Sequence, residues 1–137
     1  MIYFHSEDVS FRLKKSAIIK SWLRRVIHSH KKKTGNINFI FCSDEYLLVL
    51  NRKYLNHDAY TDIITFDNST KAALIEGDIF ISIVRVKENA QHLKVDFENE
   101  LHRVMVHGVL HLLGYDDQKK SSQKEMRKKE DECLKML

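Results

Sequence analysis

The chain has 137 residues, of which 43% are hydrophobic, and this length and composition fit one folded domain with a real core rather than a disordered segment. No apolar run approaches the roughly 20 residues that span a bilayer, and the first ten residues lack the pattern of a secretory signal, so we expect a cytoplasmic protein with no membrane partner. The net charge of +4 permits binding to a polyanion without requiring it, and two distant cysteines, Cys42 and Cys133, exclude a thiolate metal site.

The first part of the chain predicts two strands and two helices. Residues 2–4 can open a strand, and apolar residues recur every three or four positions over 10–30, which is typical of an amphipathic helix. Gly35 and its neighbour Asn36 are expected to break this pattern before a β-branched and aromatic strand over 37–43. A second helix is expected over 44–56.

The remainder of the chain predicts two more strands, over 61–67 and 77–83, and three more helices. These helices are expected to begin after Ser82, after Asp96 and at a capping box formed by Ser122 and Glu125, and to run to Leu93, Leu113 and Leu134. Helices and strands alternate only loosely, and two strands are adjacent in sequence. The pattern therefore predicts a single α+β domain over residues 1–137, with a small mixed β-sheet of about four strands packed against about five helices.

The stretch HGVLHLLGYDD, residues 107–117, carries the strongest chemical signal. His107 and His111 are four apart on a predicted helix, so both imidazoles point the same way and can bind one metal ion. Gly114 allows a sharp turn after the helix. Asp117 then falls at the position of the third histidine in the metzincin pattern HExxHxxGxxH, which makes this a zincin-like metal helix. Two imidazoles and one carboxylate leave an open position for water, as in catalytic zinc sites.

Gly108 argues against a peptidase, because it stands where the metzincin pattern has its glutamate base. We expect its missing side chain to leave room beside the metal for a bulky substrate such as a nucleic-acid backbone. The alternative interpretation of the whole stretch is a pair of core histidines followed by an ordinary loop, and the spacing of the ligands disfavours it.

HGVLHLLGYDD resembles the signature HGxLHLxGYDH of the bacterial YbeY family. LNRKYLNHDAYTDIITF (50–66) resembles that family's segment LNxxYRxxDxPTDVLSF, and GDIFIS (77–82) resembles its strand GDIxIS. The resemblance covers roughly residues 36–117. It implies an endoribonuclease directed at single strands and acting in rRNA maturation, with one zinc ion held by His107 and His111 and with Asp117 at the third ligand position.

The sequence departs from the family pattern in two ways that bear on function. Asp117 replaces a histidine, and a harder ligand weakens the preference for zinc over other divalent ions. Leu55 stands where the family usually has an arginine thought to help in RNA binding or cleavage. The nearest basic residues that can replace it are Arg52, Lys53 and Arg103.

Residues and resemblance together predict a zinc-dependent endoribonuclease of rRNA maturation and ribosome quality control, in which metal-bound water attacks an RNA phosphodiester. Candidates for orienting an imidazole by a hydrogen bond are Glu100, Asp62 and Asp78. For the two aspartates, an ordinary structural role in a turn or at the end of a strand is the alternative. Arg103 can contact phosphate or pair with Glu100. Basic residues outnumber acidic ones over 119–137, which is typical of a solvated helix face or of a phosphate-facing patch.

The expected partners are RNA, above all rRNA, and the small ribosomal subunit or its assembly factors, without DNA. Two other functions stay open at this point. One is a non-catalytic RNA- or ribosome-binding assembly factor with a structural metal. The other is a metal hydrolase of another substrate, including peptides.

Overall fold

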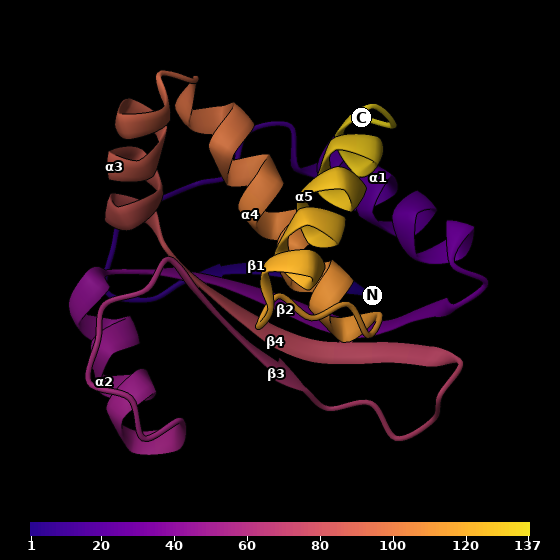
Figure 1. The fold of residues 1–137 in the computed structure, drawn as a ribbon, viewed down its shortest axis with the longest axis horizontal. Coiled ribbons are helices and arrows are strands. Elements are labelled where there is room, and N and C mark those ends of the chain that lie inside the picture. The colour runs from indigo at the N-terminus through magenta and orange to yellow at the C-terminus, as the bar shows by residue number, and fades with distance from the viewer.

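The computed structural model describes all residues from 1 to 137, and it confirms the predicted α+β architecture (Figure 1). In chain order the elements are β1 (Ile2–Ser6), α1 (Ser16–Ser29), β2 (Lys33–Cys42), α2 (Asp44–Tyr54), β3 (Ile63–Asp67), β4 (Leu74–Ser82), α3 (Ile83–Leu93), α4 (Phe97–Leu112) and α5 (Lys120–Leu134). None of these helices combines the length and the apolar character that crossing a bilayer requires.

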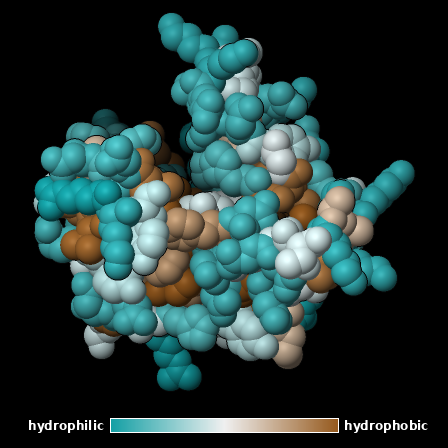
Figure 2. Space-filling view, turned by 90° about the horizontal axis from the view of Figure 1, so that it is seen from below, coloured by the Kyte–Doolittle hydropathy of each residue, from teal (hydrophilic) through white to brown (hydrophobic).

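The four strands form one mixed sheet in the order β1-β2-β4-β3. β1, β2 and β4 run parallel, and β3 pairs antiparallel with β4 at the edge. Figure 1 shows α1, α3, α4 and α5 on one side of the sheet and α2 on the other. Figure 2 views the α2 side from below, and it shows a mostly hydrophilic surface with apolar side chains gathered toward the part where α2 lies.

The alternation of β4 explains which face is buried. Ile75, Ile79 and Ile81 are buried and belong to the main core, whereas Asp78 and Phe80 point to the opposite face and are half-buried. This period of two is what a strand with one face against helices requires.

The C-terminal helix α5 packs on α4 and is also tied to α1. The indole nitrogen of Trp22, a fully buried residue of α1, donates a hydrogen bond to the backbone carbonyl of Cys133 at 2.8 Å. Cys133 and Met126 of α5 are buried in the same core cluster as Trp22. The position of α5 is therefore fixed by contacts with two helices of the same layer.

Three predicted boundaries were wrong. The first helix begins at Ser16 rather than near Ser10, because Lys15 adopts a left-handed conformation with φ of 55°. Gly35 does not break the chain but lies inside β2, where the register with β4 shifts between Thr34 and Ile37 and accommodates it. The last helix begins at Lys120.

The capping signals had mixed outcomes. Ser82 does cap α3, since its hydroxyl accepts a hydrogen bond from the backbone N–H of Arg85 at 3.2 Å. Asp96 occupies the N-cap position of α4 but makes no capping hydrogen bond. Ser122 is the third residue of α5, and its hydroxyl accepts from the backbone N–H of Lys119 at 2.9 Å. It therefore contributes to the start of this helix from inside it.

Candidate metal centre

The end of α4 and the turn after it bring three potential ligands together. Gly114 has φ of +104°, which an L-residue adopts at a cost, and the backbone N–H of Tyr115 bonds back to the carbonyl of Leu110 at 3.0 Å. This turn returns the chain toward the helix. The Nε2 atoms of His107 and His111 lie 3.0 Å apart, and Asp117 Oδ2 lies 3.3 Å and 3.7 Å from them, respectively.

The other nitrogen of each ring is already occupied by a hydrogen-bond acceptor. His107 Nδ1 is 2.6 Å from Glu130 Oε2, and His111 Nδ1 is 2.9 Å from the backbone carbonyl of Tyr115. Both Nδ1 atoms must therefore donate, and each neutral ring presents a lone pair at Nε2. A hydrogen-bond acceptor at the ring nitrogen that does not bind the metal is characteristic of metal-binding histidines.

Three electron-rich atoms thus converge with no hydrogen-bond donor between them when both rings are neutral. A four-coordinate ion with bonds of about 2.0–2.2 Å to nitrogen and oxygen keeps its ligands about 3.3 Å apart. The separations among His107, His111 and Asp117 bracket that value, and the three ligand atoms lie within 4.8 Å of one another. The residues present therefore fit a divalent cation.

The two histidines differ in their affinity for a proton. Burial lowers the pKa of His107, but the hydrogen bond and the charge of Glu130 outweigh it and raise that pKa overall. The pKa of His111 is lowered, first by burial and then by the neighbouring His107. A single proton on His107 therefore opposes a second proton on His111.

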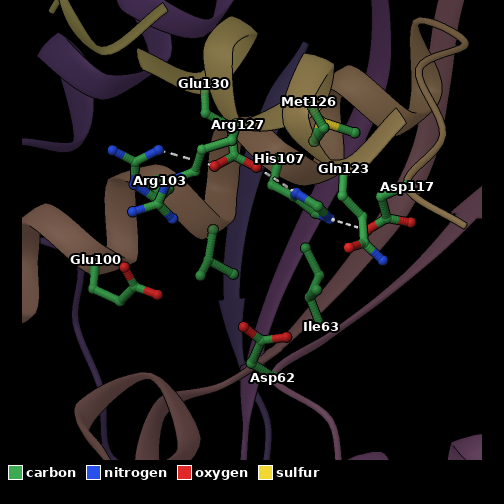
Figure 3. Close-up of a pocket in the computed structure, with 11 residues that line it drawn as sticks. Asp62, Ile63, Glu100, Arg103, His107, Asp117, Gln123, Met126, Arg127 and Glu130 are labelled. Atoms are coloured by element: carbon green, nitrogen blue, oxygen red, sulfur yellow. Dashed lines mark hydrogen bonds and ion pairs between the residues drawn. The ribbon is translucent and has the colours of Figure 1, made fainter. Parts of the chain in front are cut away.

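A pocket of about 300 Å³ opens beside these ligands (Figure 3). Its wall is formed by the start of β3 with the residue before it, by α4, by the loop after α4 and by α5. The lining residues are Asp62, Ile63, Glu100, Arg103, Val104, His107, Asp117, Gln123, Met126, Arg127 and Glu130. Small-molecule and substrate sites commonly have this size and a few converging polar groups.

Two carboxyl groups of the pocket, Asp62 and Glu100, do not bond to the histidines as we expected they might. Glu100 is buried on α4, and burial followed by the charge of Asp62 raises its pKa. Burial also raises the pKa of Asp62, against the opposing effect of His107. Both residues therefore line the pocket as carboxyl groups that bind a proton more readily than usual.

Arg103 lines the pocket but is already paired with two acids. Its guanidinium donates to Glu130 Oε1 at 3.0 Å and to Asp131 Oδ1 at 2.7 Å. It does not pair with Glu100, which was the alternative considered from the sequence. Glu130 therefore links Arg103 and His107 in one hydrogen-bonded chain, drawn in Figure 3.

Three other predicted site residues lie away from the pocket. Asp78 faces the opposite side of the sheet, where Asn38 and Asn68 donate to its carboxylate at 3.0 and 3.2 Å. Arg52 pairs with Asp58, and Lys53 lies over the ring of Tyr54 at 5.2 Å. Leu55, the C-cap residue of α2, is also absent from the pocket wall.

Gly108 does not provide space for a substrate, contrary to our expectation. A Cβ atom at this position would lie 2.9 Å from Ile79 Cγ2 and 3.0 Å from Ile63 Cδ1. The glycine therefore allows α4 to pack closely on β3 and β4. Gly108 still lacks the carboxylate that the metzincin pattern places at this position as a general base.

Glu130 is the site residue that the sequence analysis missed. It lies 23 residues from His107 on another helix, so no local spacing connects the two. A signal was nevertheless present, because Met126, Glu130 and Cys133 share one face of α5 and all three are buried. An acid in the middle of an apolar face needs a buried partner, which points to a histidine or an arginine.

Comparisons with known proteins show what this chain is similar to. The family described as "Endoribonuclease YbeY" matches residues 1–137. The chain is 52% identical to "Endoribonuclease YbeY" of Cytophaga hutchinsonii over 97% of its length and 93% of that protein, and 51% identical to that of Flavobacterium psychrophilum over 100% and 96%. The solution structure of TM1509 from Thermotoga maritima superposes with a TM-score of 0.69 at 28% identity, covering 99% of this chain and 88% of that one.

Proposed function

Because the chain belongs to the endoribonuclease YbeY family, we propose that it is a metal-dependent endoribonuclease that cleaves single-stranded RNA during the maturation of ribosomal RNA. The observation that carries the proposal is the convergence of ligand atoms from His107, His111 and Asp117 at the edge of a pocket. We expect one zinc ion per chain, with other divalent ions competing because of the carboxylate. We also expect the small ribosomal subunit or its assembly factors as partners, in the cytoplasm.

A divalent metal in this position, when bound, would supply Lewis acidity that lowers the pKa of water toward about 7 and offsets charge on phosphoryl oxygens. The chain's own groups prepare the site. Glu130 and the carbonyl of Tyr115 keep the proton of each imidazole on Nδ1, so both Nε2 lone pairs are available. Rings oriented in this way need no rearrangement when the metal arrives.

Asp62 and Glu100 affect how the pocket wall interacts with an anionic substrate. Because burial raises their pKa values, these carboxyl groups hold protons more readily than exposed ones do. A protonated carboxyl repels a phosphodiester less than a carboxylate does, and it can donate a hydrogen bond. The raised pKa values of Asp62 and Glu100 therefore reduce the electrostatic cost of placing an anion beside these two residues.

The test compares cleavage of two polymers by zinc-loaded protein. Labelled single-stranded RNA and casein are incubated with the wild type, with His107→Ala and with His92→Ala, an exposed histidine of α3 outside the pocket. The proposal expects RNA cleavage by the wild type and by His92→Ala, and none by His107→Ala. RNA binding by all three without cleavage would favour an assembly factor, and cleavage of casein alone would favour a peptidase.

A further inference from the structure

The pocket contains one guanidinium that makes no ion pair. Arg127 of α5 lines the pocket wall and is exposed, and no carboxylate oxygen lies within 4.0 Å of it. The other guanidinium of the pocket, that of Arg103, is held by Glu130 and Asp131. Releasing Arg103 would leave the buried carboxylate of Glu130 without its cationic partner and with only the hydrogen bond from His107, which is costly. Arg127 is therefore the cation of this pocket that is free to meet an anion.

The other basic residues that the sequence suggested for this task are not in the pocket. Arg52 and Lys53 lie on α2, and neither contributes to the pocket wall. The position of Leu55 carries no charge. An RNA phosphate that enters this pocket thus meets a single cationic side chain without an ion-pair partner, that of Arg127.

Arg127 has a neighbour that suits the same ligand. Gln123 lies one helical turn earlier on α5, on the same side of the helix, and it also lines the pocket. Its amide can donate a hydrogen bond, and the guanidinium can donate two in a fork that matches a phosphate. The ligand residues and these two side chains thus line the same pocket (Figure 3).

We propose that Arg127 and Gln123, which line this pocket from successive turns of α5, form its phosphate-binding subsite and hold a phosphodiester of single-stranded RNA in the pocket that contains the metal ligands. The inference rests on the proposed function and specifies which residues contact its substrate. The surrounding charges agree with it. Glu130 is paired with Arg103, and burial raises the pKa values of Asp62 and Glu100, so that these two carboxyl groups bind a proton more readily than exposed ones do.

The test measures binding separately from cleavage. A fluorescent single-stranded oligonucleotide with 2′-O-methyl riboses is titrated with zinc-loaded protein, and gels check that it stays intact. Arg127→Ala is compared with Lys128→Ala, which removes the same charge from the next residue of α5, an exposed position outside the pocket. Zinc affinity is measured for each variant to show that the ligands are undisturbed.

We expect Arg127→Ala to raise the Kd about tenfold and Lys128→Ala to raise it less than twofold. Loss of one phosphate contact should also reduce the slope of log Kd against log salt by about 0.7. Equal effects of the two variants, or unaltered binding by Arg127→Ala, would overturn the inference. A wild type that binds the oligonucleotide but does not cut RNA would contradict the proposed function and leave the Arg127 comparison decisive.

Discussion

Replacing Glu130 by glutamine tests whether the hydrogen bond between Glu130 and His107 Nδ1 supports the candidate metal centre. Glu130 is buried and accepts charge-assisted hydrogen bonds from His107 at 2.6 Å and from Arg103 at 3.0 Å. Glutamine keeps the size of the side chain but has a single acceptor oxygen. Its amide nitrogen must therefore face either the ring N–H of His107 or the guanidinium of Arg103, donor against donor.

The magnitude follows from these contacts. Each charge-assisted hydrogen bond contributes about 1.5–3 kcal/mol, and breaking a buried pair costs about 3–5 kcal/mol. We expect Glu130→Gln to lower the free energy of unfolding of the metal-free protein by about 3 kcal/mol. Loss of the carboxylate behind His107 should also weaken metal binding about 10- to 100-fold, equivalent to about 1.4–2.7 kcal/mol.

Urea unfolding of the metal-free protein measures the first effect, and competition with a chromophoric zinc chelator measures the second. Glu132→Gln is the matched control, since Glu132 lies on the same helix and makes only an exposed pair with Lys129. The control should change neither quantity appreciably. If Glu130→Gln binds zinc as tightly as the wild type, Glu130 does not orient His107, and the explanation of the ring geometry is refuted.

Three further predictions use other parts of the structure. A chelator should lower the melting temperature of zinc-loaded wild type by roughly 10 °C at ion concentrations of about 100 times Kd, and should leave His107→Ala unchanged; a wild-type curve that does not move would argue against the site. Gly108→Ala should destabilise the fold by about 1 kcal/mol in urea, because crowding against Ile79, about 1–3 kcal/mol, outweighs a helix-propensity gain of about 1 kcal/mol; a more stable variant would disprove the close approach. The hydrogen bond from Arg103 holds the pKa of Asp131 below its usual value, so its stabilisation is present above about pH 4 and is lost as pH falls through the lower folded pKa. The difference between wild type and Asp131→Asn in urea midpoint should therefore shrink below pH 4, and a difference that grows there would reverse the assignment.

Local signals in the sequence were sufficient for the elements and for the ligand cluster. The two histidines share a helix, and Asp117 follows after a turn that Gly114 permits, so short-range geometry alone brings them together. The same reasoning failed where partners come from distant segments. Asp78 lies in an alternating strand, and the period of two places it on the face opposite the histidines, where its partners Asn38 and Asn68 come from other segments.

The role of α5 could not be obtained from spacing, because its contacts with α4 depend on how the two helices pack. The sequence left its basic residues open between a solvated face and a phosphate-facing patch. The structure divides them, placing Arg127 on the pocket wall and Lys128 outside it. One residue of difference along a helix turns the side chain by about 100°, and only the packing of Met126 and Glu130 fixes which direction is inward.

The docking of α5 has a consequence for the motions of the protein. The helix carries Glu130 but none of the three convergent ligand atoms. Besides its core packing, it is tied to α4 by the hydrogen bonds of Glu130 and Asp131 and to α1 by the hydrogen bond between Trp22 and Cys133. A transient detachment of α5 would leave both imidazoles on α4 and remove the carboxylate behind one of them. Occupancy by an ion should therefore slow amide hydrogen exchange throughout α5, so that a segment contributing no coordination bond reports on the loading of the centre.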